Sequence, residues 1–337
     1  MAIRYLILSL TRHCNLRCVY CYNGEGNGKT VDMPEAVIAK AIREVASQGE
    51  LFHLQLTGGE PTLVPESIKK ALVLAHDTGR CRSLGIQTNA TCLTPDLLRL
   101  FKTHDVQVGV SLDGPPAIHQ QQRGMAAETL RGLQMLEAAG IPFRVTTVVT
   151  QTNADALDRL VLTLAGFGCA RGIGLDLLVG KGRAGAFGAV APADASTLEK
   201  GLFRMLDVLA DVNRCRSLPI RLREQDLIVC NTKKKPVFCH ACRGESLAVD
   251  PDGGLYPCGQ TLGDETFSAG TIWQPQYDRL TSLREFKPLG VSCNSCDIAA
   301  VCPGDCPSRL YYNRKINADL ICTVYRTIDN GKWRMKN

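Results

Sequence analysis

Thr11-Arg-His-Cys-Asn-Leu-Arg-Cys-Val-Tyr-Cys-Tyr22 follows a short apolar stretch near the start of the chain. It spaces Cys14, Cys18 and Cys21 as C-x3-C-x2-C, and the next cysteine is Cys81. Three thiolates this close in sequence can hold three irons of a [4Fe–4S] cluster, which normally has four cysteine ligands. The fourth iron would then be open to a small chelating ligand. The spacing alone also permits a zinc loop with a distant fourth ligand, or three cysteines that lie in a core.

A second motif, Thr57-Gly-Gly-Glu-Pro-Thr62, ends an apolar run downstream, and the aromatic residue Tyr20 directly precedes Cys21. With both motifs the chain resembles the radical S-adenosylmethionine (radical SAM) superfamily. The hallmark of that superfamily is C-x3-C-x-aromatic-C after the first barrel strand and Gly-Gly-Glu-Pro after the second. The resemblance implies that the open iron chelates the amino and carboxylate groups of SAM. An electron from the cluster would cleave the sulfonium, and the resulting 5′-deoxyadenosyl radical would abstract a substrate hydrogen.

The composition is that of an ordinary globular protein of 337 residues, with 45% hydrophobic and 21% charged residues and a net charge of +6. Its length permits one large domain, or a large and a small one. The tight basic run Lys233-Lys-Lys235 favours a solvated loop over a nucleic-acid patch. The N-terminal apolar run is too short for a membrane span and lacks a cleavage pattern, so we expect a cytoplasmic protein. Sixteen cysteines in such a protein indicate metal rather than disulfides.

Strands alternate with helices through the first half of the sequence, which predicts βα units and parallel strands. The expected strands cover 3–10, 51–56, 83–87, 106–111, 143–149 and 173–178. The expected helices start near Pro34 and cover about 65–78, 95–104, 126–139, 154–167 and 194–213. Six such units match the partial (β/α)6 barrel of the resembled superfamily, an α/β fold. In such barrels the chemistry lies on the loops after the strand C-termini.

Several of these loops resemble SAM-binding elements of the superfamily. The two glycines of the second motif would let the backbone approach the methionine part of SAM. Thr88-Asn89 would lie near the ribose and amino group, and the loop with Asp113 near the ribose, although Asn and Asp are also turn formers. Arg123 would reach the SAM carboxylate or form a surface salt bridge. The residues assigned to SAM binding are Tyr20, Gly58, Gly59, Glu60, Thr88, Asn89, Ser111, Asp113 and Arg123.

Two further stretches match elements of this family less completely. Ile118-His-Gln-Gln-Gln-Arg123 resembles the family's His-Asp-x-x-Arg stretch, but Gln120 stands where Asp is usual. Lys181-Gly-Arg-Ala184 resembles a Gly-Arg-Ala element after the last barrel strand, and the sequence indicates no role for it.

From Cys239 onward, cysteines and Pro/Gly loops dominate. The spacing C-x10-G-x4-C from Cys242, C-x2-C-x5-C-x3-C from Cys293, and then Cys322 resembles the seven-cysteine SPASM extension of radical SAM enzymes. The resemblance implies two auxiliary [4Fe–4S] clusters in this extension. Together with the SAM-binding cluster, the protein would hold three. A pair of zinc ribbons is the alternative for the C-x2-C pairs.

The family pattern divides these cysteines between the two auxiliary clusters. Three ligands of the nearer cluster would be Cys242, Cys258 and Cys306. The fourth iron of this cluster would be bound by Cys239, the preferred choice, or by Cys230, or it would be open to substrate. The ligands of the outer cluster would be Cys293, Cys296, Cys302 and Cys322. The predicted regions are a barrel at 1–184, a linking helical region at 185–235 and a loop-dominated SPASM domain at 236–337.

SPASM enzymes mostly modify peptides or proteins, so the resemblance implies a maturase that oxidatively forms a thioether, C–C or related crosslink in a ribosomally made peptide. One alternative is a sulfatase-maturating enzyme, which makes formylglycine. Those relatives have an Asp after the second cysteine of the extension, where this chain has Gly259. Another alternative is a small-molecule radical SAM oxidoreductase. A non-catalytic iron–sulfur electron carrier or a zinc-dependent nucleic-acid binder would need no Gly58-Gly-Glu-Pro61 motif beside an open three-cysteine site.

The expected partners follow from this chemistry. The stretch 11–22, which carries Cys14, Cys18 and Cys21, is called the cluster loop below. Because it begins near residue 11, we expect no peptide-recognition domain before the barrel. A separate leader-peptide-binding protein, or the barrel mouth with residues 185–235, would then present the peptide or protein substrate. The SAM cluster needs a reductant such as flavodoxin or ferredoxin, and neither nucleic acid nor membrane is an expected partner. The sequence assigns no general acid or base.

Overall fold

The computed structural model of the chain describes residues 2–24, 32–188, 190–230, 237–286, 293, 295–314 and 319–331. The chain divides into two compact units, which are described separately below. Unit 1 comprises Met1–Arg17, Asn23–Gly109 and Cys239–Phe286. Unit 2 comprises Cys18–Tyr22, Val110–Phe238 and Lys287–Asn337.

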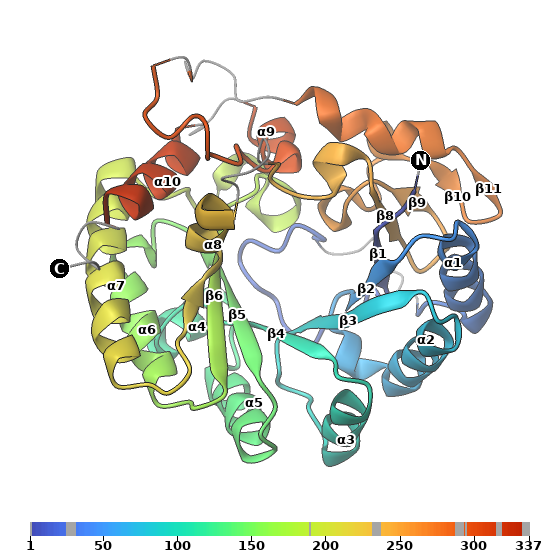
Figure 1. Cartoon of the computed structure of the whole chain (residues 1–337), viewed down its shortest axis with the longest axis horizontal. Coiled ribbons are helices and arrows are strands. Elements are labelled where there is room, and N and C mark those ends of the chain that lie inside the picture. Colours follow the sequence, from blue (N-terminus) through green and yellow to red (C-terminus); the bar gives the residue numbers. More distant parts are fainter. Residues whose placement is uncertain are drawn as a thin grey trace. The chain divides into compact units, whose positions relative to one another are not determined.

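Strands alternate with helices through the first half of the chain, which confirms the expected α/β organisation (Figure 1). The helices are α1 (Glu35–Ser47), α2 (Pro65–Asp77), α3 (Pro95–Thr103), α4 (Pro116–Gln122), α5 (Ala126–Ala138), α6 (Leu157–Ala165), α7 (Ala195–Arg214), α8 (Arg223–Cys230), α9 (Pro307–Asn313) and α10 (Leu320–Gly331). The strands are β1 (Tyr5–Ser9), β2 (Phe52–Thr57), β3 (Cys81–Thr88), β4 (Gln107–Ser111), β5 (Phe143–Val149), β6 (Ala170–Leu177), β7 (Arg221–Leu222), β8 (Ser246–Val249), β9 (Leu255–Tyr256), β10 (Gly270–Thr271) and β11 (Gln274–Pro275). The six expected strands are β1 to β6.

In unit 1, β1 lies between β2 and β8 and pairs with both in parallel. β3 pairs in parallel with β2, and β9 pairs antiparallel with β8. Leu6, Leu54 and Leu84 lie side by side on adjacent strands, on the face that packs against helices, and all three are buried. Because β1, β2 and β3 are parallel, the loops that follow them emerge at the same edge of the sheet.

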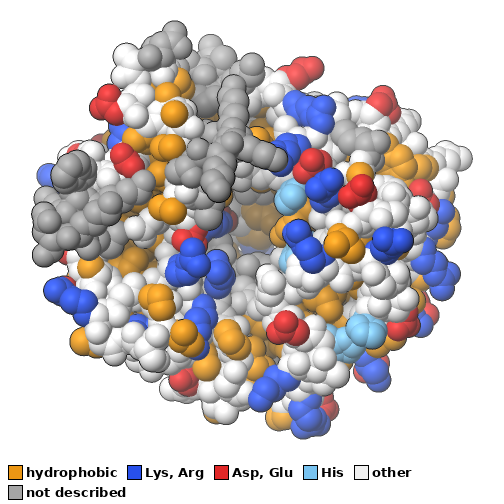
Figure 2. All heavy atoms as spheres, in the orientation of Figure 1, with side chains coloured by type: hydrophobic (Ala, Val, Ile, Leu, Met, Phe, Trp, Pro, Cys, Tyr) orange, Lys and Arg blue, Asp and Glu red, His pale blue; other side chains and the backbone are white. Residues whose placement is uncertain are grey.

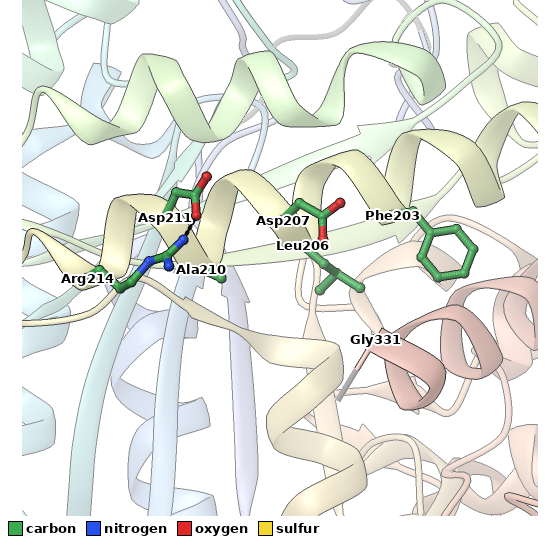
Figure 3. Close-up of a pocket in the computed structure, with 7 residues that line it drawn as sticks. All are labelled: Phe203, Leu206, Asp207, Ala210, Asp211, Arg214 and Gly331. Carbon is green, nitrogen blue, oxygen red and sulfur yellow. Dashed lines mark hydrogen bonds and ion pairs between the residues drawn. The ribbon is translucent and has the colours of Figure 1, made fainter. Parts of the chain in front are cut away.

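In unit 2, β5 and β6 pair in parallel, and β7 continues the sheet beside β6. α10 packs against α7 where Gly331 meets Leu206, and a Cβ at Gly331 would lie 2.6 Å from Leu206 Cδ1. Beside this contact lies a cavity of about 230 Å³ on α7, in which Asp211 is paired with Arg214 (Figure 3). Its lining includes no cysteine.

The compact units do not follow the expected boundaries at 184/185 and 235/236. Residues Cys239–Phe286 belong to unit 1 because β8, which lies just after Cys242, adds a parallel strand to β1. The region expected to link the two domains, 185–235, contains the 20-residue helix α7 and lies in unit 2. The part of the chain that the structure describes has no helix long and apolar enough to cross a membrane. On the face drawn in Figure 2, basic side chains are interspersed with acidic and uncharged ones.

Candidate functional site

In unit 1 the glycine motif after β2 is bonded directly to the cluster loop after β1. The Gly59 amide donates to Thr11 O at 2.7 Å, and the Glu60 amide donates to His13 O at 2.8 Å. A Cβ at Gly59 would lie 2.2 Å from His13 O, and one at Gly58 would lie 2.6 Å from Thr11 O. These two loops can meet only because Gly58 and Gly59 have no side chains. The resemblance had explained the same two glycines by the approach of SAM.

Glu60 holds the glycine motif against the loop after β3. Glu60 is 1% exposed, and its carboxylate accepts hydrogen bonds from Thr62 Oγ1, Thr88 Oγ1 and the Asn89 amide, each at 2.6 Å. Burial raises the pKa of Glu60, and these hydrogen bonds oppose that shift. Because its oxygens are occupied by protein donors, Glu60 positions the loops of the site rather than offering a free carboxylate.

Asparagine side chains connect the same loops. Asn89 Nδ2 donates to Asn15 Oδ1 at 2.9 Å, and Asn15 Nδ2 donates to Thr91 Oγ1 at 2.7 Å. Asn89 Oδ1 accepts the Thr91 amide at 2.9 Å. The structure therefore joins the loops after β1, β2 and β3, and Thr88 and Asn89 take part in this junction.

In unit 2, three of the residues assigned to SAM bind one another. Asp113 Oδ2 accepts hydrogen bonds from the Tyr20 hydroxyl and from Arg123 Nε, the latter at 3.0 Å, and Asp113 Oδ1 accepts the Val148 amide at 3.0 Å. The Arg123 guanidinium lies 5.2 Å from the centre of the Tyr20 ring. The side chains of Asp113 and Arg123 are 0% and 10% exposed.

The loop with Asp113 is the one that the resemblance places near the ribose, and the Asp113 carboxylate in it is buried and bonded to protein donors. A surface salt bridge was one expectation for Arg123, but its salt bridge with Asp113 is buried. Burial also raises the pKa of Tyr20 well above its usual value, so its hydroxyl stays protonated and donates to Asp113. Together, Asp113 and Arg123 fix the aromatic residue of the cluster loop.

Arg183 lies in the motif at 181–184, for which the sequence indicated no role, and it also holds the cluster loop. Its Nε donates to Cys18 O at 2.9 Å, and its backbone amide donates to Cys21 O at 2.9 Å. Burial raises the pKa of the Cys18 thiol, and the positive charges of Arg123 and Arg183 oppose that shift. The local pattern of residues 181–184 does not predict a contact with a loop so far away in sequence.

The variant Arg183→Gln should weaken this hold. A hydrogen bond from a charged donor contributes roughly 1.5–3 kcal/mol, so we expect iron loss to a chelator to be about 10- to 100-fold faster. The measurement is the rate of bleaching of the reconstituted protein by a chelator. Arg214→Gln is the matched control, because Arg214 is exposed and its ion pair among the described residues is with Asp211 on the same helix. Equal rates in the two variants would contradict this role for Arg183.

Three of the cysteines assigned to the nearer auxiliary cluster lie together in unit 1. The Sγ atoms of Cys239 and Cys242 are 3.6 Å apart. Burial raises the pKa of Tyr5 to about 12, and the nearby Cys258 and Cys239 add to the shift. The side chain of Cys230, the second choice for the fourth ligand, lies outside the described residues.

Unit 2 contains the remaining five cysteines of the extension. Burial raises the pKa values of Cys302 and Cys322, and Cys293 and Cys296 raise both further, so the four cysteines assigned to the outer cluster are neighbours. Cys306 Sγ lies 3.0 Å from Ser308 Oγ.

Backbone amides donate to sulfur at three of the cysteines, each from the residue two positions later. Cys14 Sγ accepts the Leu16 amide at 3.4 Å, Cys258 Sγ accepts the Gln260 amide at 3.5 Å, and Cys302 Sγ accepts the Gly304 amide at 3.4 Å. Hydrogen bonds to sulfur are a means by which proteins tune iron–sulfur clusters. Within the described ranges, no three His, Cys, Asp or Glu side chains gather as the ligands of a single metal ion do.

Comparison with known proteins agrees with this site. Residues 8–163 match the Radical SAM superfamily. The chain is 29% identical over 323 residues to the serine-type anaerobic sulfatase-maturating enzyme of Klebsiella aerogenes, which covers 88% of this chain and 78% of that protein. It is 27% identical over 339 residues to the AdoMet-dependent heme synthase of Methanosarcina barkeri, which covers 92% of this chain and 93% of that protein.

Two solved structures share the fold. The structure of native anSMEcpe with bound AdoMet and Cp18Cys peptide has a TM-score of 0.79 and 20% identity, and covers 100% of this chain and 98% of that one. Streptococcus suis SuiB bound to the precursor peptide SuiA has a TM-score of 0.67 and 16% identity, and covers 90% of this chain and 72% of that one. These likenesses confirm the expected α/β partial-barrel fold. With the cysteine loop and the glycine motif inside the matching region, residues 8–163 form a domain of the Radical SAM superfamily.

Proposed function

We propose that this enzyme oxidatively matures a peptide, forming a thioether or C–C type crosslink. The SAM cluster is assigned to Cys14, Cys18 and Cys21, and the two auxiliary clusters to the cysteines of the extension. When bound, the clusters and SAM supply a 5′-deoxyadenosyl radical and an acceptor for the electron left over. The chain's own residues do the positioning: Glu60, Asn89, Tyr20 with Asp113, and Arg183 hold the loops of the site.

One observation of unit 1 carries the oxidative part of the proposal. The cluster loop follows the carboxyl end of β1, and Cys239 and Cys258 lie near Tyr5 at its amino end. β1 has five residues, so these cysteines and the cluster loop are separated by roughly 17 Å of strand. A substrate beside β1 would then have Cys14 toward one end of the strand and Cys239 and Cys258 toward the other. This arrangement suits a reaction that removes a hydrogen atom and then an electron.

The peptide part of the proposal rests on the relatives, among which are a sulfatase-maturating enzyme and peptide-bound structures. Formylglycine formation is disfavoured because Gly259 follows Cys258 where an Asp would be expected as base. The nearest later Asp, Asp264, uses its carboxylate to accept the Thr266 amide at 3.0 Å and so caps a turn. We place the enzyme in the cytoplasm, with flavodoxin or ferredoxin as reductant.

A small-molecule oxidoreductase is the second candidate, because the AdoMet-dependent heme synthase matches over 92% of this chain. Anaerobic incubation with SAM and dithionite tests the shared chemistry through 5′-deoxyadenosine. Adding cysteine-containing peptide pools then tests the substrate class: the maturase should yield a peptide that has lost two hydrogens, detected by mass spectrometry. A fully iron-loaded enzyme that makes no 5′-deoxyadenosine would refute both candidates.

A further inference from the structure

Unit 1 has a cavity of about 490 Å³ at the amino ends of its strands, on the face of the sheet opposite the helices. The residues that matter here are Tyr5, His53, Gln55, Arg82, Ser83 and His240. None of these side chains is aliphatic. In a closed barrel the corresponding interior is filled by branched apolar side chains, whereas this cavity is lined by polar and aromatic ones.

Gly85 leaves room for two polar side chains of the cavity wall. A Cβ at Gly85 would lie 2.7 Å from Gln55 Oε1 and 3.0 Å from His53 Nε2. A larger residue at position 85 would therefore push these two polar side chains away from the sheet.

Three rings form one wall. The Tyr5 ring is stacked on His53 with centres 4.7 Å apart and on His240 with centres 5.5 Å apart. Gln55 Oε1 accepts from Tyr5 Oη and His53 Nε2, both at 3.3 Å, and His53 Nδ1 lies 2.8 Å from Ser83 Oγ. Since an amide oxygen only accepts, His53 carries its proton on Nε2, and Nδ1 accepts from Ser83. The wall is thus fixed by its own hydrogen bonds.

The charge of the cavity comes mainly from Arg82. Its side chain is exposed and makes no hydrogen bond or ion pair within the part of the chain that the structure describes. Burial lowers the pKa of His53, as do the nearby Arg82 and His240, so His53 is neutral at pH 7. Among the described residues that line the cavity there is no carboxylate, and Glu245 Oε2 lies 3.1 Å from Nδ1 of the lining residue His240.

We propose that this cavity binds a carboxylate of the substrate, with Arg82 as its ion-pairing residue and the three-ring wall supporting the adjoining part of the substrate. The proposal rests on the proposed function, since it names a chemical feature of that same substrate. A planar guanidinium can bind a carboxylate through two parallel hydrogen bonds. The carboxylate belongs either to an Asp or Glu side chain or to the C-terminus of a peptide.

The test uses the anaerobically reconstituted full chain and three small probes: acetyl-Gly-Glu-Gly-amide, acetyl-Gly-Gln-Gly-amide and acetyl-Gly-Gly-Gly with a free C-terminus. Dissociation constants are measured by ligand-observed NMR. We expect at least one carboxylate probe to bind about 10-fold or more tightly than the Gln probe. Which of the two binds more tightly identifies the source of the carboxylate. Wild-type 5′-deoxyadenosine formation, measured on the same preparation, tests the proposed function separately.

Arg82→Gln should abolish the preference for carboxylate, and Arg82→Glu should reverse it in favour of acetyl-Gly-Lys-Gly-amide. Arg80→Gln is the matched control, because Arg80 is an exposed arginine just before β3 that does not line the cavity. It should bind the probes as the wild type does. The inference is overturned if the wild type does not distinguish the Glu probe or the free C-terminus from the Gln probe, or if Arg82→Gln keeps the preference.

Discussion

Replacing Cys14, Cys18 and Cys21 together with alanine is expected to remove about one third of the bound iron and all cleavage of SAM. Three [4Fe–4S] clusters would hold about twelve irons, and loss of one leaves about eight. The auxiliary clusters should survive, because the cysteines assigned to them lie elsewhere in the chain. Iron and sulfide analysis with Mössbauer spectra, together with a 5′-deoxyadenosine assay, measures both effects on anaerobically reconstituted protein.

The control for this experiment is a second triple variant, in which Cys81, Cys169 and Cys215 are replaced with alanine. None of these three belongs to either spacing motif, and Cys215 is exposed. Their replacement should leave the iron content and the 5′-deoxyadenosine yield unchanged. About four irons in the wild type, falling to none in the first variant, would show that the extension holds no clusters. Zinc in place of that iron would return the extension to a structural role.

The barrel strands were predictable because their signal is local. The expected strand at 143–149 is β5 as the structure has it, since a run of apolar and β-branched residues there specifies a strand without reference to the rest of the chain. β8 was missed for the opposite reason. It has only four residues, and it becomes a strand by pairing with β1, more than two hundred residues earlier. Such pairing leaves no periodicity in the sequence.

The candidate site shows the same division between local and distant information. The cysteine spacings are local and carried the family resemblance, which assigned four cysteines to the outer cluster; in the structure these four are neighbours. The roles of Asp113 and Arg183 depend on partners 93 and 165 residues away, Tyr20 and Cys18. Resemblance could name Asp113 as a site residue, but only the fold shows that its carboxylate holds Tyr20.

Gly59→Ala is the single substitution from which we expect the largest loss. The new Cβ would lie 2.2 Å from His13 O, a backbone atom that cannot rotate away as the end of a side chain can. The two loops would have to separate, which breaks the amide hydrogen bonds from Gly59 to Thr11 and from Glu60 to His13. Overpacking costs ~1–3 kcal/mol, and each lost hydrogen bond adds about 1 kcal/mol. The free energy of unfolding should therefore fall by about 3–5 kcal/mol.

Gly59→Ala should impair cluster binding and SAM cleavage more than the loss of stability alone would, because the broken hydrogen bonds position the loop that carries Cys14. We expect Gly59→Ala to retain little iron at the SAM cluster and to make no 5′-deoxyadenosine, while the outer-cluster cysteines in unit 2 keep their iron. Gly166→Ala is the matched control: Gly166 has φ −72° at the end of α6, and a Cβ there meets nothing within 4 Å. Alanine at such a position stabilises by about 0.4–1 kcal/mol. Full iron content and wild-type SAM cleavage in Gly59→Ala would show that the two loops can separate without harm, and that the glycine serves SAM rather than the contact with His13.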